Sequence, residues 1–180
     1  LNLETTQAGN VITITLNAGT YAANSETAPC VLNQPSTSSW TSLTITPIGA
    51  VTVSGAIAAG SPLIDLNGAD NVTIDGISIS NNFTFNNTST SSASETSTIR
   101  FQSDARNNKI RNCRIFGSAA MPQSTPGGTV FFGGNSLTTG NDNNVVSNCD
   151  IGSASPSINL PAKGVCMIGT TTSTSTNNSG

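Results

Sequence analysis

The acidic and basic side chains are the first candidates for chemistry in this sequence. Asp65, Asp70 and Asp75 lie close together in the chain. A glycoside hydrolase needs two carboxylates about 5–9.5 Å apart, one of them with a raised pKa. A polysaccharide lyase needs a basic proton acceptor, for which Arg106 or Arg111 is available, beside carboxylates that bind calcium, but the sequence has no second row of acids. We therefore expect no catalytic residues, and a polysaccharide lyase or hydrolase is the enzymatic alternative.

Composition excludes several classes of function. The 180 residues include no histidine, which rules out Ser-His-Asp and Cys-His catalysis, histidine zinc sites and histidine pH switches. Six Lys and Arg and a net charge of -3 give no basic surface for nucleic acid or an anionic membrane. The segment 141–144 lacks the acids and the terminal Glu of a calcium loop. We expect no cofactor, no metal site, no nucleic-acid partner and no membrane insertion.

An internal repeat determines where these side chains lie. The segments 70–79, 106–115 and 142–151 align without gaps, and each begins 36 residues after the previous one. Their shared pattern is two short alternating strands that meet at a corner. The corner position holds Gly or Asn, which tolerate left-handed backbone angles: Gly76, Asn112 and Asn148. We expect equivalent apolar residues to stack in two rows: Ile74, Ile110 and Val146, and Ile79, Ile115 and Ile151.

Such a unit cannot bury its apolar face alone, but it can do so against a copy of itself. The hydrophobic content of 35% is enough for one core, and abundant β-branched residues favour an all-β chain. We predict one domain, residues 1–180, folded as a right-handed parallel β-helix whose coils lie about 4.8 Å apart. Further strands are expected at 11–16, 43–45, 51–53, 63–66, 99–101, 130–132 and 165–168, with polar insertions at 81–98, 118–128, 133–141 and 152–163.

The same alignment stacks opposite charges on neighbouring coils. The charged rows are Asp70, Arg106 and Asp142 at the first position, Asp75 and Arg111 at the sixth, and Arg114 and Asp150 at the ninth. Opposite charges directly across a sheet attract by roughly 0.2–1 kcal/mol, and a neighbouring arginine lowers the pKa of a carboxyl group. We interpret these side chains as scaffold contacts that set the register of the coils.

Three stretches resemble a known repeat family. They are 19–21, 43–47 and especially 64–76, which reads Ile-Asp-Leu-Asn-Gly-Ala-Asp-Asn-Val-Thr-Ile-Asp-Gly. They look like the pectate-lyase-like β-helix repeats of large secreted and cell-surface proteins of Bacteroidetes-type bacteria, over most of the chain from about residue 10. The resemblance implies an extracellular β-helix, usually one module of a longer surface protein. It does not imply lyase activity, because such modules commonly lack the lyase site.

The four cysteines do not form an obvious disulfide framework. Cys113 and Cys149 occupy equivalent inward positions, so their Cα atoms should lie about 4.8 Å apart. That separation permits a disulfide, but parallel side chains do not converge as the bond prefers. We expect free thiols at both positions. Cys30 and Cys166 lie outside the repeat register.

The ends of the chain bear on its function. The first thirty residues lack a basic start followed by an apolar run, so we expect neither a signal peptide nor a membrane span. No amphipathic helix is available to cap an end coil, so we expect a fragment of a longer β-helix or a subunit that stacks end to end into a fibre. The predicted function is a non-enzymatic structural or adhesive module, extracellular or on the cell surface, whose partners are copies of itself or further repeats of the same chain. A polysaccharide-binding module, with glycans as partners, is the second alternative.

Overall fold

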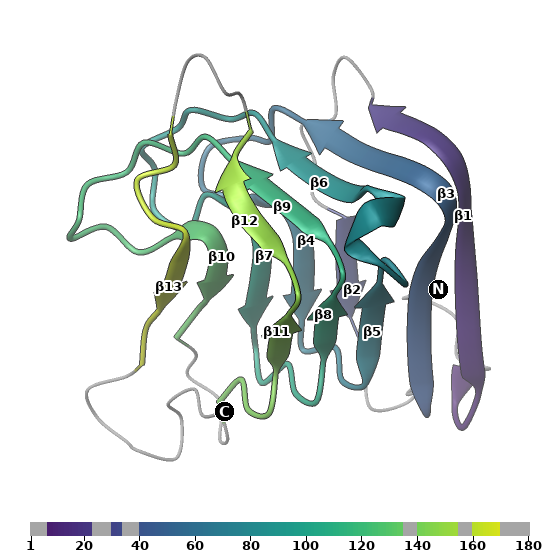
Figure 1. Cartoon of the computed structure of the whole chain (residues 1–180). Helices are drawn as coiled ribbons and strands as arrows, with labels where there is room; N and C mark the ends of the chain where they lie inside the picture. The colour runs from purple at the N-terminus through teal and green to yellow at the C-terminus, as the bar shows by residue number, and fades with distance from the viewer. Residues whose placement is uncertain (1–6, 23–29, 34–39, 135–139, 155–159, 170–180) are drawn as a thin grey trace.

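The computed structural model describes residues 7–22, 30–33, 40–134, 140–154 and 160–169. The chain winds into a parallel β-solenoid of about four turns, with two parallel sheets as its walls (Figure 1). The predicted all-β parallel β-helix is therefore confirmed. Among the described residues, no helix is long and apolar enough to span a membrane.

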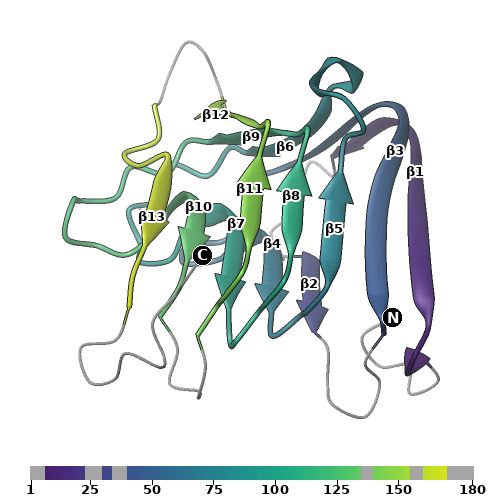
Figure 2. The same ribbon diagram turned by 60° about the horizontal axis from the view of Figure 1, so that its bottom comes forward.

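Sheet A carries the predicted repeat. Each pass of the chain through it begins a new coil, and the first two passes are long strands that run through the corner: β1 (Val11–Ala22) and β3 (Ser42–Gly55). In coils 3, 4 and 5 the corner divides the pass into two short strands: β5 (Val72–Asp75) and β6 (Phe83–Asn87), β8 (Lys109–Arg111) and β9 (Arg114–Gly117), β11 (Val145–Ser147) and β12 (Asp150–Ser153). The spatial order is β11-β8-β5-β3-β6-β9-β12, with β1 paired to β3. Figure 2 shows β1, β3, β5, β8 and β11 side by side.

Sheet B closes the opposite wall. Its strands are β2 (Cys30–Asn33), β4 (Pro62–Asn67), β7 (Ser97–Gln102), β10 (Gly128–Phe132) and β13 (Val165–Met167), in the order β13-β10-β7-β4-β2. A short 3-10 helix, η2 (Ile79–Asn81), lies between β5 and β6. Strand β1 therefore lies at one end of the solenoid and β11, β12 and β13 lie at the other (Figure 1).

The core fills the space between the two sheets. Because parallel strands pair in register, residues of equal rank stack into rows along the solenoid. The predicted row is present and begins two coils earlier than the repeat: Ile14, Ile45, Ile74, Ile110 and Val146. Sheet B contributes the row Leu32, Leu66, Phe101, Phe132 and Met167. Within it, the rings of Phe101 and Phe132 stack with centroids 4.6 Å apart, so aromatic packing adds to the aliphatic rows.

The second predicted apolar row starts with a different residue. Ile115 pairs with Ile151 as expected, but on its other side it pairs with Phe85. Ile79 lies instead in η2, because coil 3 inserts six residues (85 − 79) between the corner and its second strand. A gapless alignment cannot represent this insertion, so the prediction for Ile79 is wrong. Phe85, which is 3% exposed, fills that position of the core.

The corner is left-handed in two of the three repeats. Asn112 and Asn148 have φ of 58° and 49°, as predicted, but Gly76 does not have a positive φ. Glycine is required there for another reason: a Cβ atom would lie 2.0 Å from the backbone oxygen of Asn112. The left-handed residue in coil 3 is the next one, Ile77, with φ of 67°. The Ser78 N–H donates to Gly76 O at 2.7 Å across it, which is a tight and strained turn for a β-branched side chain.

Candidate functional site

Two of the predicted ion pairs join neighbouring coils. Asp75 alternates with the buried Ile74 and so points outward, where Arg111 Nε donates to its Oδ2 at 2.9 Å and Arg111 Nη2 lies 2.8 Å from the same oxygen. Asp70 accepts the backbone N–H of Arg106 at 2.7 Å on Oδ1, and Arg106 Nη2 lies 3.5 Å from Oδ2. Each arginine is used to hold a carboxylate of the preceding coil, as expected of scaffold contacts.

The third charged row differs from the prediction. Arg114 and Asp150 face each other in β9 and β12, but this pair is not among the ion pairs of the described residues. Thr84 lies opposite Arg114 on the other side, because of the insertion that also displaces Ile79. Asp142 accepts the N–H of Asn107 through its backbone oxygen at 3.1 Å, and an ion pair with Arg106 stays a prediction.

The two paired carboxylates titrate in opposite directions. Burial raises the pKa of Asp75, but hydrogen bonds from Asn112 Nδ2 and the Ile77 N–H, together with Arg111, outweigh it and lower that pKa below its ordinary value of 3.8. At Asp70 burial is the larger effect, and the pKa is raised despite the Arg106 N–H and charge. The expectation of a lowered pKa at Asp70 is therefore wrong. A raised pKa suits a general acid, but both oxygens of Asp70 are already engaged by Arg106.

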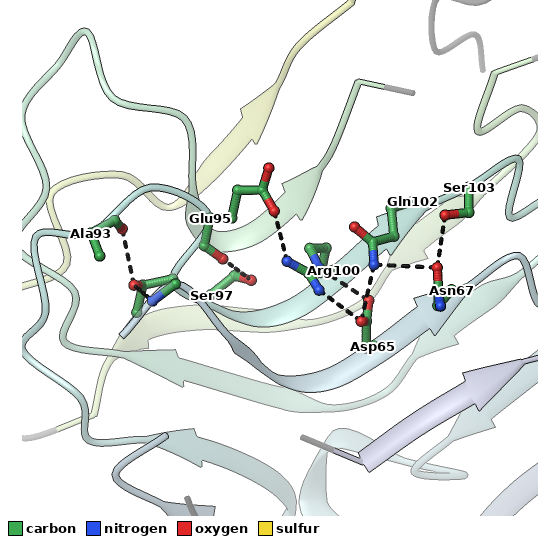
Figure 3. A network of polar contacts seen from close by, with 10 residues as sticks. Asp65, Asn67, Ala93, Glu95, Ser97, Arg100, Gln102 and Ser103 are labelled. Atoms are coloured by element: carbon green, nitrogen blue, oxygen red, sulfur yellow. Dashed lines mark hydrogen bonds and ion pairs between the residues drawn. The ribbon is translucent and has the colours of Figure 1, made fainter. Parts of the chain in front are cut away.

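A second charged cluster lies on sheet B and was not predicted. Arg100 makes a bidentate contact with Asp65, through Nε to Oδ1 at 3.1 Å and Nη2 to Oδ2 at 2.8 Å, and its Nη1 donates to Glu95 at 2.8 Å (Figure 3). The Asp65 and Arg100 side chains are only 4% and 11% exposed. One guanidinium thus contacts both carboxylates.

Amide and hydroxyl groups extend this cluster along the sheet. Gln102 Nε2 donates to Asp65 at 3.1 Å and to Asn67 at 3.3 Å, and Ser103 Oγ donates to Asn67 Oδ1 at 2.7 Å (Figure 3). Asn67 Nδ2 in turn donates to Asn33 Oδ1 at 2.9 Å. The contacts link coils 1, 2 and 3. Because nearly all polar groups of these side chains are hydrogen-bonded, they indicate a structural network rather than a reactive site.

Asparagines at the turn into sheet A form further rows that were not predicted from the sequence. Asn71, Asn107 and Asn143 have φ of 58°, 57° and 55° at the turn into sheet A. Directly after them, the completely buried Asn108 accepts the Val72 N–H at 2.8 Å, and its own N–H donates to Asn144 Oδ1 at 3.0 Å. The available signal was the paired asparagines at equivalent positions of two repeats.

Cys113 and Cys149 form no disulfide, and neither do Cys30 and Cys166. The first two stack on adjacent coils, because the N–H of Asp150 donates to Cys113 O at 3.0 Å. Cys113 is completely buried and Cys149 is half-buried. In the described part of the chain, no group of three or more His, Cys, Asp or Glu is arranged to hold a metal ion.

The ends of the core are its least covered parts. The apolar residues that are only partly buried against the core belong to the first two coils and to the last: Ile12, Ile14, Leu16, Ile45, Val53, Val146, Cys149 and Ile151. A cavity of about 410 Å³ lies between the sheets in the first coils, lined by apolar side chains such as Leu16, Val53 and Phe83. At the other end Val165 and Met167 are 58% and 55% exposed.

Comparison with known proteins does not supply a relative. No family model, no curated protein and no solved structure matches the chain.

Proposed function

We propose that the chain is a non-enzymatic structural module of an extracellular or cell-surface β-solenoid, which stacks end to end on copies of itself or on further coils. The single observation that carries the proposal is how the burial of the apolar side chains varies along the solenoid. The middle coils bury their apolar rows, whereas several apolar side chains of sheet A are only partly buried in the first two coils and in the last. Apolar area removed from water stabilises by roughly 25 cal/mol per Å², so covering both ends favours association.

The two ends offer complementary surfaces. The row that begins with Ile14 ends with Val146, and the row that begins with Leu32 ends with Met167. A second copy placed with its first coil on the last coil of this one would continue both rows without a break. Contacts of this head-to-tail kind use two different surfaces, so they extend into a filament unless the rotation closes a ring.

The outer face of the sheet supports the same arrangement. On β1 the outward side chains beside Ile14 are Thr13 and Thr15, and the outward side chains of β11 are Val145 and Ser147. None of the four carries a charge, so continued pairing brings no like charges together. In the described part of the chain, β1 pairs with β3 and β11 pairs with β8, which leaves their other edges available for parallel pairing.

Kinship with the pectate-lyase-like surface repeats is part of the proposal. It is supported by residues 64–76, which run from β4 into β5. Engagement of the carboxylates of Asp65, Asp70 and Asp75 with arginines supports the non-enzymatic role. Polysaccharide binding or cleavage would contradict the structural role. Glycan-array binding by the soluble monomer, or release of unsaturated or reducing ends from acidic polysaccharides, would be evidence for those alternatives.

The decisive experiment measures assembly. Sedimentation velocity over a range of concentrations and negative-stain microscopy of the 180-residue chain are expected to show linear oligomers. Met167→Lys places a charge on the last coil and should shift the population to monomer. The matched control is Ile48→Lys, since Ile48 is 61% exposed but lies at the lateral corner in β3, and it should leave assembly unchanged. A wild-type chain that stays monomeric at all concentrations, or equal effects of both variants, contradicts self-stacking.

A further inference from the structure

Cys113 and Cys149 have the same surroundings, one coil apart. Cys113 Sγ donates to Arg111 O at 3.1 Å and lies 4.0 Å from Ile74 O. Cys149 Sγ donates to Ser147 O at 3.2 Å and lies 3.6 Å from Ile110 O. Ser147 and Ile110 are the residues 36 positions after Arg111 and Ile74. The two thiols therefore have one orientation and differ by a translation along the solenoid.

This translation decides what the pair can bind. Stacked coils are about 4.8 Å apart, so two sulfur atoms with the same orientation are separated by about that distance. A disulfide requires sulfur atoms about 2.05 Å apart with converging Cβ vectors, which this arrangement does not provide. A metal–thiolate bond is about 2.3 Å long, so one ion midway between the sulfurs reaches both without rearrangement of either side chain.

The geometry points to a metal site: we infer that Cys113 and Cys149 bind one Cu(I) ion in linear, two-coordinate geometry. The two side chains are related by a translation along the solenoid, so an ion between the sulfurs lies on the line that joins the two coils. Soft thiolates select Cu(I). Within the described residues no third His, Cys, Asp or Glu joins the pair, which disfavours the four-ligand site that structural zinc adopts.

The reaction balances without an oxidant. Cu(I) forms two metal–sulfur bonds, the two thiols release two protons, and copper keeps its oxidation state. Binding therefore strengthens as pH rises. The neighbouring Cys113 thiol is the largest effect on Cys149 and, with the N–H groups of Cys113, Ser147 and Asn112, lowers the pKa of that thiol despite burial. The Cys149 thiol and burial raise the pKa of Cys113, so the proton of Cys113 leaves when the metal replaces it.

Access favours entry past Cys149. This thiol is half-buried in the last described coil, whereas Cys113 is completely enclosed by coils 3 and 5. The site needs both of the stacked coils 4 and 5 of one chain and does not require a second copy. It is therefore independent of the proposed end-to-end stacking.

The test is competition for Cu(I) between the intact chain and a chromophoric Cu(I) chelator under anaerobic conditions. One ion per chain is expected, with thiolate-to-copper charge-transfer absorption and an X-ray absorption spectrum that shows two sulfur neighbours. Cys149→Ser should lower the affinity about 100-fold or more, beyond the range for outer-shell changes. The matched control, Cys30→Ser with Cys166→Ser, removes the other two thiols and should keep the site.

Two further measurements keep the outcome clear. Because Cys113 is completely buried, Cys113→Ala is used only where its circular dichroism matches that of the wild type, and it should also lose the site. Cu(I) should protect Cys149 from alkylation by N-ethylmaleimide in the control variant. Retained affinity in Cys149→Ser, loss of affinity in the control, or a disulfide between Cys113 and Cys149 in place of copper binding would each overturn the inference.

Discussion

Asn148 Nδ2 donates to Asn112 Oδ1 at 2.5 Å, although the two residues are 36 positions apart in the chain. Asn112 Nδ2 in turn donates to Asp75 Oδ1 at 2.8 Å. The corner of sheet A is therefore linked across coils 3, 4 and 5 by side chains as well as by the backbone. This direct contact establishes that the repeat stacks in register, and it ties the corner to the ion pair of Asp75 with Arg111.

Replacement of Asn112 separates its two roles. Asn112→Ala removes the hydrogen bonds to Asp75 and Asn148 and forces alanine to adopt a φ of 58°. We expect a loss of about 2–3 kcal/mol in the free energy of unfolding, measured by urea denaturation. Asn112→Gly adopts the positive φ without strain and loses only the hydrogen bonds, so its loss of stability should be smaller. Equal losses in the two variants would show that backbone angle has no part in the cost.

A methyl group at Gly76 is expected to be far more damaging than its size suggests. The Cβ of Gly76→Ala would lie 2.0 Å from Asn112 O, a backbone atom of the next coil. Coils 3 and 4 would have to separate, and we expect a loss of about 3 kcal/mol or more in the same denaturation experiment.

Gly152→Ala is the control for Gly76→Ala. Gly152 also lies in sheet A without a positive φ, but its Cβ would meet the Phe116 ring at an ordinary 3.6 Å. It should change stability by less than about 1 kcal/mol. If Gly76→Ala is equally mild, the close approach of the two coils is not a constraint on the fold.

The ion pair on sheet B should depend strongly on both partners. Arg100→Met leaves Asp65, which is 4% exposed, buried without its counter-charge, and we expect a loss of about 3–5 kcal/mol in the free energy of unfolding. The double variant Asp65→Leu with Arg100→Met removes both charges and should recover much of that loss.

Arg114→Met is the comparison for Arg100→Met. Arg114 faces Asp150 without forming one of the ion pairs of the described part of the chain, so its loss should fall within about 0.5 kcal/mol. A double variant that is no more stable than Arg100→Met would mean that Arg100 acts through packing rather than through charge.

The contacts of segments that repeat without insertion could be predicted from the sequence. Ile74, Ile110 and Val146 stack as expected because their strands begin at the same offset from the turn in each coil. The prediction for Ile79 is wrong, since a gapless alignment hides the insertion that brings Phe85 into the row. The number of residues per coil varies, and only the pairing of strands across the sheet shows where the extra residues are inserted.

The cluster around Arg100 was hidden for a related reason. Asp65 and Arg100 were each placed in predicted strands, but they are 35 positions apart rather than 36, so the repeat did not align them. The raised pKa of Asp70 could not be predicted from the sequence either, because it depends on how much of the carboxyl group is buried. The sign of the charge predicts the partner, whereas the direction of the pKa shift follows from the balance between burial and that partner.

The opposite pKa directions of Asp75 and Asp70 predict opposite pH dependence. The folded pKa of Asp75 lies below 3.8, so its ionised form contributes stability that is fully present above pH 3.8 and is lost as pH falls through the lowered pKa. Asp75→Asn should therefore lower Tm by about 3–8 °C near pH 7, and the difference from the wild type should shrink in acid. The folded pKa of Asp70 lies above 3.8, so its ionisation lowers stability as pH rises through that raised pKa.

Asp70→Asn removes the destabilising charge, so its Tm should rise relative to the wild type as pH increases from about 3 to 7. The measurement is Tm as a function of pH for the wild type and both variants by circular dichroism. Each variant serves as the control for the other, because each removes one carboxylate that contacts an arginine of coil 4. Parallel curves for the two variants would show that burial does not outweigh Arg106 at Asp70, and that arginine contact alone governs both groups.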